Sequence, residues 1–128
     1  MITESQLEQL ALSWFQVIGW VHASGPDLAP DGPAPERTNY NEVVLRGRLR
    51  EALERLNPQL PAEAIEKALH TATTVNEPTL VKRNHAFHRM MLDGVPVDWS
   101  TTDGKRFDHA RLLDFQNPDN NDFLIVDQ

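Results

Sequence analysis

The sequence has 128 residues and lacks cysteine, long apolar runs and an excess of positive charge. The absence of cysteine excludes disulfides, thiolate metal sites and cysteine nucleophiles. No run approaches the roughly 18 apolar residues that a membrane helix needs, and the polar, acidic amino terminus does not resemble a signal peptide. We therefore expect no membrane association and a cytoplasmic location.

The charge balance is acidic, with 12 basic and 19 acidic residues. A domain that binds nucleic acid by neutralising phosphates is usually basic, so DNA contact would need a local patch or a neighbouring protein. Basic residues gather over residues 46–55 and 82–89. Both groups lie on predicted helices with interleaved acidic residues, which is typical of solvated helix faces.

Length and composition indicate one soluble globular region, since 40% of the residues are apolar and 24% are charged. We expect residues 1–128 to form a single segment of one domain. Residues 22–38 contain four prolines and two glycines, which predicts a long extended loop without a helix or a strand ladder.

Apolar spacing predicts four helices. The first begins at a capping box of Thr3 and Gln6 and ends at Gly19. The second ends at Asn57-Pro58, the third begins near Pro61, and the fourth runs from about Pro78 to Asp93-Gly94.

Three strands follow. Residues 95–99 alternate between apolar and polar, and Asp103-Gly104 is a hairpin-turn dipeptide. A return strand is expected over about 107–115, and residues 123–126 are apolar on both faces, which is typical of a buried strand. The prediction is an α+β fold of about four helices followed by a three-stranded, mainly antiparallel sheet. The last strand leaves an open edge, which makes self-association a reasonable expectation.

Several stretches, taken in this order, resemble the amino-terminal part of the R (restriction) subunit of type I restriction–modification enzymes. They are residues 3–8 with Gly19-Trp20, residues 25–32, residues 48–53 with 56–58, residues 84–88, residues 93–97, and residues 114–123.

The resemblance covers essentially the whole chain and implies the opening of a PD-(D/E)xK nuclease domain of the RecB-like type. The fold would then be an incomplete nuclease of the α/β type, with its catalytic strands missing. The implied parent is a large subunit that cleaves DNA with Mg²⁺, translocates it with ATP, and works with methylation and specificity subunits. No Gly-x-x-x-x-Gly-Lys occurs here, so we expect neither ATP nor Mg²⁺ to bind this chain tightly.

Pro118-Asp119 looks like the first half of the nuclease motif, whose second half is Glu-x-Lys or Asp-x-Lys on the next strand. The nine residues after Asp119 contain neither Glu nor Lys, so the motif cannot be completed there. Asp103-Gly104-Lys105 has the right letters, but it favours a turn between strands. Asp27 and Asp31 also follow prolines, and loop anchoring is their expected role. The isolated chain should therefore be inactive.

Glu8 is the one candidate site residue. Nucleases of the resembled class often place a glutamate of the first helix near the metal, and Glu8 occupies a comparable position. The alternative is a solvated carboxylate on the helix surface.

Two other functions stay open. The chain could be a non-catalytic interaction module that docks on restriction–modification subunits through the Pro-rich loop or the sheet edge. It could also be a small metal-dependent hydrolase that uses His85 and His88, which have metal-compatible spacing on a helix. No third ligand is evident, so packing is the favoured role of His88. Trp14, Trp20 and Trp99 are predicted core anchors.

Overall fold

A computed structural model describes all residues from 1 to 128. In chain order the elements are helix α1 (Glu4–Val17), strand β1 (Val21–Ala23), α2 (Gly25–Leu28), α3 (Arg46–Leu56), α4 (Ala62–Thr73), α5 (Leu80–Asp93), β2 (Val95–Thr101), β3 (Gly104–Ala110), the 3-10 helix η1 (Pro118–Asn120) and β4 (Leu124–Val126). This mixture confirms the α+β class. None of the helices is both long and apolar enough to cross a bilayer.

The chain forms two compact units. Unit one consists of residues 1–45 and 122–128, and unit two consists of residues 46–121. In the sequence, unit two is therefore inserted between the two segments of unit one.

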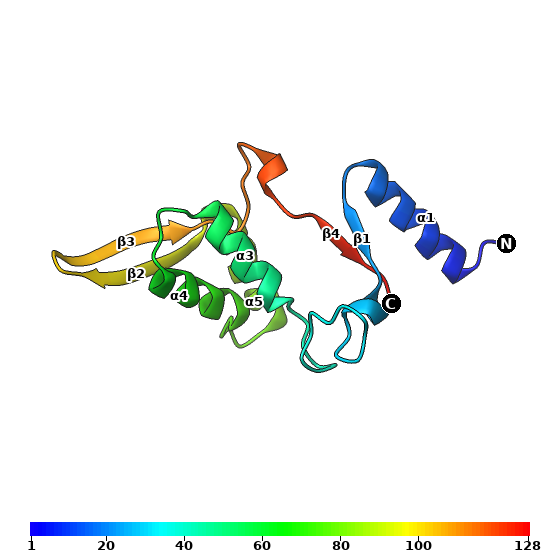
Figure 1. Ribbon diagram of the computed structural model, residues 1–128, viewed down its shortest axis with the longest axis horizontal. Coiled ribbons are helices and arrows are strands. Elements are labelled where there is room, and N and C mark those ends of the chain that lie inside the picture. The colour runs from blue at the N-terminus through cyan, green and yellow to red at the C-terminus, as the bar shows by residue number, and fades with distance from the viewer. The chain divides into compact units, whose positions relative to one another are not determined.

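In unit one the central feature is a parallel pairing of β1 with β4. Val21, His22 and Ala23 stand opposite Leu124, Ile125 and Val126, and Figure 1 shows the two strands side by side. The prediction of one three-stranded sheet is therefore wrong in its strand pairing. The last strand pairs with residues far back in the chain and not with the hairpin, which forms a separate two-stranded sheet.

Helix α1 begins as its sequence predicts. The Thr3 hydroxyl accepts a hydrogen bond from the Gln6 amide at 3.1 Å, and the Gln6 side chain accepts one from the Thr3 amide at 2.8 Å. Gly19 follows the helix with a φ of 101°, in the left-handed region where a side chain would be strained. The capping box and the glycine stop are both confirmed.

The tryptophans differ from the expectation of three core anchors. Trp14 lies on the surface of α1 with an exposed fraction of 60%, and Leu12 is the only buried residue of that helix. Trp20 is half-buried and packs against Phe15 and Phe123 at centroid distances of 5.3 and 5.1 Å. Trp99 is half-buried against the core of unit two. The prediction is therefore wrong for Trp14.

The Pro-rich segment 22–38 contains more regular structure than predicted. It includes most of β1 and the four-residue helix α2, whose N-terminal turn carries Pro26. Proline is tolerated there because the first helical amides have no partner within the helix. The remainder is irregular but anchored, because the amides of Ala34 and Glu36 donate to the carbonyls of Asp27 and Leu28.

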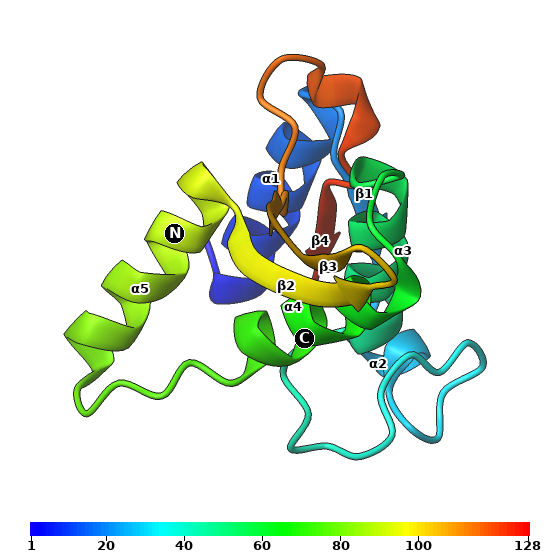
Figure 2. The same ribbon diagram turned by 90° about the vertical axis from the view of Figure 1, so that its left-hand side faces the viewer.

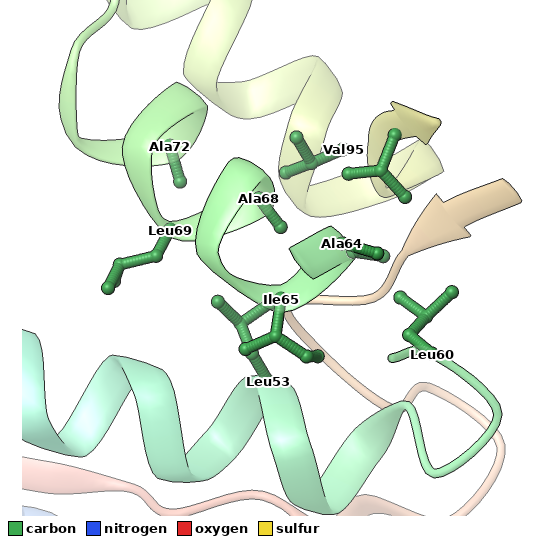
Figure 3. Close-up of a cluster of buried hydrophobic side chains, with 10 residues drawn as sticks. Leu53, Leu60, Ala64, Ile65, Ala68, Leu69, Ala72 and Val95 are labelled. Atoms are coloured by element: carbon green, nitrogen blue, oxygen red, sulfur yellow. The ribbon is translucent and has the colours of Figure 1, made fainter. Parts of the chain in front are cut away.

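Unit two has its own hydrophobic core between α4, α3 and the β2–β3 hairpin. Leu53 of α3 meets Ile65 of α4, while Ala64 and Ala68 face Val95 of β2 (Figure 3). Leu53, Ala64, Ala68 and Val95 are all fully buried. The small alanine side chains let the strand approach the helix closely, and α3 and α5 lie on opposite sides of α4 (Figure 2).

A hairpin forms where the sequence predicts one, with connecting residues one position before the predicted Asp103-Gly104. Val95 pairs with Ala110 and Thr101 with Gly104, so Thr102 and Asp103 form a two-residue connection. Gly104 has a φ of 115°, which only glycine adopts readily at a tight turn. The turn is confirmed, whereas the return strand ends at Ala110, earlier than the predicted Phe115.

Asn57 is the buried polar link of unit two. It is 1% exposed, its Oδ1 accepts from the Arg111 amide at 2.7 Å, and its Nδ2 donates to the carbonyls of Arg111 and Leu53 at 3.0 and 2.9 Å. The side chain therefore joins the end of α3 to the chain that leaves β3. Its polar atoms are satisfied in a site without water access.

Replacement of this side chain should destabilise unit two. Asn57→Ala leaves the Arg111 peptide group without its partners, which we expect to lower the free energy of unfolding by about 2–4 kcal/mol. Urea denaturation followed by far-ultraviolet circular dichroism measures the change. Asn76→Ala, at an exposed asparagine of the same unit, is the control and should change stability by less than about 0.5 kcal/mol. Equal effects of the two variants would contradict the assignment.

Candidate functional site

The carboxyl ends of β1 and β4 carry a compact polar cluster in unit one. Asp127 follows β4, and its Oδ2 lies 3.0 Å from Nε2 of His22 on β1. Its Oδ1 accepts the backbone amide of Gly25 at 3.0 Å. A single carboxylate thus joins β4, β1 and the start of α2.

Gly25 allows this arrangement. A Cβ atom at this position would come within 2.3 Å of the Asp127 carbonyl oxygen, closer than real side chains approach backbone. The absence of a side chain therefore lets the chain turn from β1 into α2 directly against the end of β4.

The same contacts control the charge of Asp127. The Gly25 amide, which donates to the carboxylate, and His22 beside it hold the pKa of Asp127 below its usual value. Hydrogen bonds to the ionised form favour that form over the protonated acid. Both carboxylate oxygens are occupied, so Asp127 is a structural acid in this chain.

Glu8, the predicted site residue, lies near this edge. It is half-buried on α1, and its Oε1 is 3.5 Å from the backbone nitrogen of Gln128. The first helix thus brings a carboxylate to the carboxyl end of the parallel pair. Ligands bind preferentially at such edges of parallel sheets.

A hollow of about 700 Å³ adjoins the cluster in unit one. It is lined by residues of the Pro-rich loop, among them Asp31 and Arg37, together with Tyr40, Asp127 and Gln128. The Tyr40 hydroxyl donates to Asp31, and the Arg37 guanidinium donates to the carbonyls of Tyr40 and Glu42. These bonds stabilise the irregular chain beside the hollow.

The sequence lacks the second half of the nuclease motif, and the fold does not gather acidic or histidine side chains into a metal-binding cluster. No group of three or more His, Cys, Asp or Glu residues is arranged to hold a metal ion. The residues of this chain therefore do not by themselves fit a Mg²⁺ site, which needs several oxygen ligands.

Asp119 lies in η1, within a turn organised by another acid. The Oδ1 of Asp114 accepts the amides of Gln116 and Asn117 at 3.0 and 2.9 Å, and its Oδ2 accepts from the Asn120 side chain at 3.0 Å. The Asn117 amide is the main reason that the pKa of Asp114 is lowered. Asp119 is exposed at the tip, so the interpretation of Pro118-Asp119 as part of a turn agrees with the geometry.

The other residues that match part of the nuclease motif or a metal-site spacing also lie apart from one another. Asp103 lies in the hairpin turn, Lys105 lies on β3 just after it, and Asp27 lies exposed in α2. His85 and His88 are both exposed on α5, so the predicted packing role of His88 is wrong and no third ligand joins the pair.

Sequence reasoning did not identify His22 and Asp127 as partners. They are 105 residues apart, and neither belongs to a recognisable short motif. The one available signal is Gly25, since a glycine directly after a strand marks a close backbone approach.

The hydrogen bonds of Asp127 predict how the Gly25 amide responds to pH. A carboxylate with a lowered folded-state pKa stabilises the fold above its unfolded pKa, and this stabilisation is lost as pH falls through the folded pKa. We expect the NMR shift of the Gly25 amide proton to titrate with a midpoint below 3.8, the ordinary value of an aspartate.

Two variants make this experiment specific. Asp127→Asn should abolish the titration of the Gly25 amide, and His22→Gln should move its midpoint upward while the Gly25 bond persists. Asp119→Asn, at an exposed acid of unit two, serves as the control and should leave the curve unchanged. A wild-type midpoint at or above 3.8 would show that the Gly25 bond is absent in solution.

The chain was compared with known proteins. A family model described as the type I restriction enzyme R protein N terminus matches residues 1–128. The HindI type I restriction enzyme endonuclease subunit of Haemophilus influenzae is 36% identical over all 128 residues. The putative MjaIXP type I restriction enzyme endonuclease subunit of Methanocaldococcus jannaschii is 28% identical over 122 residues, or 95% of the chain.

The chain spans 12% of the length of each of these two relatives. No solved structure shows a significant match. The family model nevertheless covers every residue, in agreement with the resemblance of the sequence stretches. The chain therefore belongs to the type I restriction enzyme R protein N-terminal family.

Proposed function

We propose that this chain is the amino-terminal region of a type I restriction endonuclease subunit, and that the longer subunit cleaves DNA. The match of the family model over residues 1–128 carries the proposal, together with the 12% coverage of much longer endonuclease subunits. In such a subunit this region would supply the opening of the nuclease domain.

The chain by itself is proposed to be inactive. It offers no cluster of metal ligands, and Asp119 and Asp103 lie in turns. The metal-binding carboxylates and the lysine of the nuclease motif would come from other parts of the longer subunit. ATP would likewise bind elsewhere, because the sequence has no phosphate-binding Gly-x-x-x-x-Gly-Lys loop.

The partners follow from the same proposal. The subunit would act on DNA in a multi-subunit complex with methylation and specificity subunits, in the cytoplasm. Self-association through the edge of β4 that β1 leaves free stays a separate prediction.

Cleavage assays test the proposed function. The 128-residue chain, added to supercoiled DNA with Mg²⁺, should leave the DNA intact, because it lacks the metal-ligand set. The full-length subunit, assembled with its partner subunits and supplied with ATP and Mg²⁺, should convert the same DNA to linear product. Cleavage by the short chain would disprove its inactivity, and a full-length complex without any cleavage would disprove the endonuclease assignment.

Glu8 is proposed as an accessory acid of the nuclease site in the full-length subunit. Its half-buried carboxylate lies near the end of β4, at the carboxyl edge of the parallel strand pair. Glu8→Gln should reduce DNA cleavage by about 10- to 100-fold, the usual loss for a group that supports a metal site, and leave ATP hydrolysis unchanged. Glu4→Gln, an exposed glutamate in the first turn of the same helix, is the matched control. Equal cleavage by both variants would assign Glu8 to a solvated helix surface.

A further inference from the structure

The two units carry very different charge. Unit one has eight acidic residues and one basic residue, whereas unit two has eleven of each. The entire net charge of −7 therefore resides in unit one. A polyanion would be repelled by unit one, and eleven of the twelve cations that could attract it lie in unit two.

Within unit two, α5 has no acidic residue between Glu77 and Asp93, but it carries Lys82, Arg83 and Arg89. This differs from the expectation of interleaved acids at both basic clusters. On α3 that expectation holds, since Glu51 and Glu54 lie among the arginines.

The cations of unit two also differ in their contacts. Arg50 forms an ion pair with Glu66 at 2.8 Å, and Lys67 binds the Asp98 carboxylate at 2.9 Å. The side chains of Lys82, Arg83 and Arg89 form no hydrogen bond or ion pair, and all three residues are exposed. Arg50 and Lys67 are thus paired within unit two, whereas the α5 cations, like Lys105 and Arg106 of the hairpin, are available to a ligand.

Helix α5 is itself weakly packed. It has 14 residues and none of them is buried, although Met90 contacts the edge of the core. Helices of this length are only marginally stable in water without tertiary contacts. A surface that binds α5 would therefore also stabilise it.

The faces of α5 are chemically distinct. Lys82, His85 and Arg89 follow one another at intervals of three and four residues, so they form one stripe. Leu80 and Phe87, seven residues apart, lie on the opposite face. The first face gathers most of the basic side chains and ends at Asp93, whereas Arg83 lies nearer to the second face.

We propose that the stripe of Lys82, His85 and Arg89 on α5 contacts the phosphate backbone of duplex DNA. The inference rests on the proposed function, in which DNA is the substrate of the longer subunit. At a rise of about 1.5 Å per residue, Lys82 and Arg89 are roughly 10 Å apart along the helix. Phosphates of one strand are spaced by about 3.4 Å along the DNA axis, so the stripe spans several of them.

Such contacts position DNA without reading its sequence. The stripe would hold the duplex on unit two, and the acidic unit one would not attract it. This role is separate from phosphodiester cleavage, because no metal-ligand cluster lies on α5.

NMR titration of the ¹⁵N-labelled 128-residue chain with a short duplex DNA at low salt tests the proposal. The amide signals of residues 80–93 should shift and those of unit one should not. The shifts should weaken as salt is raised. Lys82→Gln/Arg89→Gln should reduce the slope of log affinity against log salt by about 1.8, since each phosphate contact contributes roughly 0.9. Glutamine preserves helix propensity, so α5 should stay folded.

The control is Arg50→Gln/Lys67→Gln, which removes the same charge from the same unit but from cations that are already paired. Its salt slope should match that of the wild type, and equal losses in both variants would reduce the effect to net charge and overturn the proposal. Shifts of α5 caused by a polyglutamate peptide but not by DNA would overturn it in favour of an acidic protein partner. If the full-length subunit cleaves DNA but the α5 signals of the 128-residue chain do not shift with DNA, this inference is refuted. The proposed function then still stands.

Discussion

Unit one depends on the parallel pairing of two three-residue strands that lie about a hundred residues apart in the sequence. Closing a loop of this length costs conformational entropy, and three ladder positions provide few hydrogen bonds to offset it. The cost is smaller when the intervening chain is folded, and unit two has a buried core of its own. The carboxylate of Asp127 then adds side-chain bonds to His22 and to the Gly25 amide at the end of the pair.

The end of this strand pair gathers the polar groups of unit one. The carboxyl edge of the β1–β4 pair collects Glu8, Asp127 and the hollow beside the Pro-rich loop. Both oxygens of Asp127 are engaged in hydrogen bonds within unit one, whereas Glu8 has one long contact to the backbone nitrogen of Gln128. The proposed accessory role of Glu8 rests on this difference.

The two units differ in their charge. Eight acids against one cation make unit one a poor surface for DNA, although an acidic region attracts divalent cations. Unit two holds almost every cation, and those on α5 have no partner within the chain. The net charge of the whole chain does not reveal this difference, because it is the sum over a neutral unit and an acidic unit. The acidic composition of the whole chain argued against a DNA-binding surface. The division into units shows that unit two is neutral, so such a surface on unit two can be tested.

Much of the local structure was predictable, because its causes lie within a few residues. The capping box of Thr3 and Gln6, the glycine stop after α1, the Asn57-Pro58 end of α3 and the Asp103-Gly104 turn each follow from neighbouring backbone and side-chain atoms. The turn assignment of Asp119 was also accessible, because no Glu or Lys follows it. β1 and α2 were not predicted, because each has only three or four residues and the prolines and glycines around them indicated an irregular loop.

By itself the sequence determined the four longer helices, the hairpin, the family and the absence of a complete nuclease motif. Only the tertiary structure decided which strands pair, that Asn57 joins α3 to the end of β3, and that Asp127 meets His22 and Gly25. These contacts join residues 54 to 105 positions apart. A pairing over such a distance depends on the path of the whole intervening chain, so no local pattern encodes it.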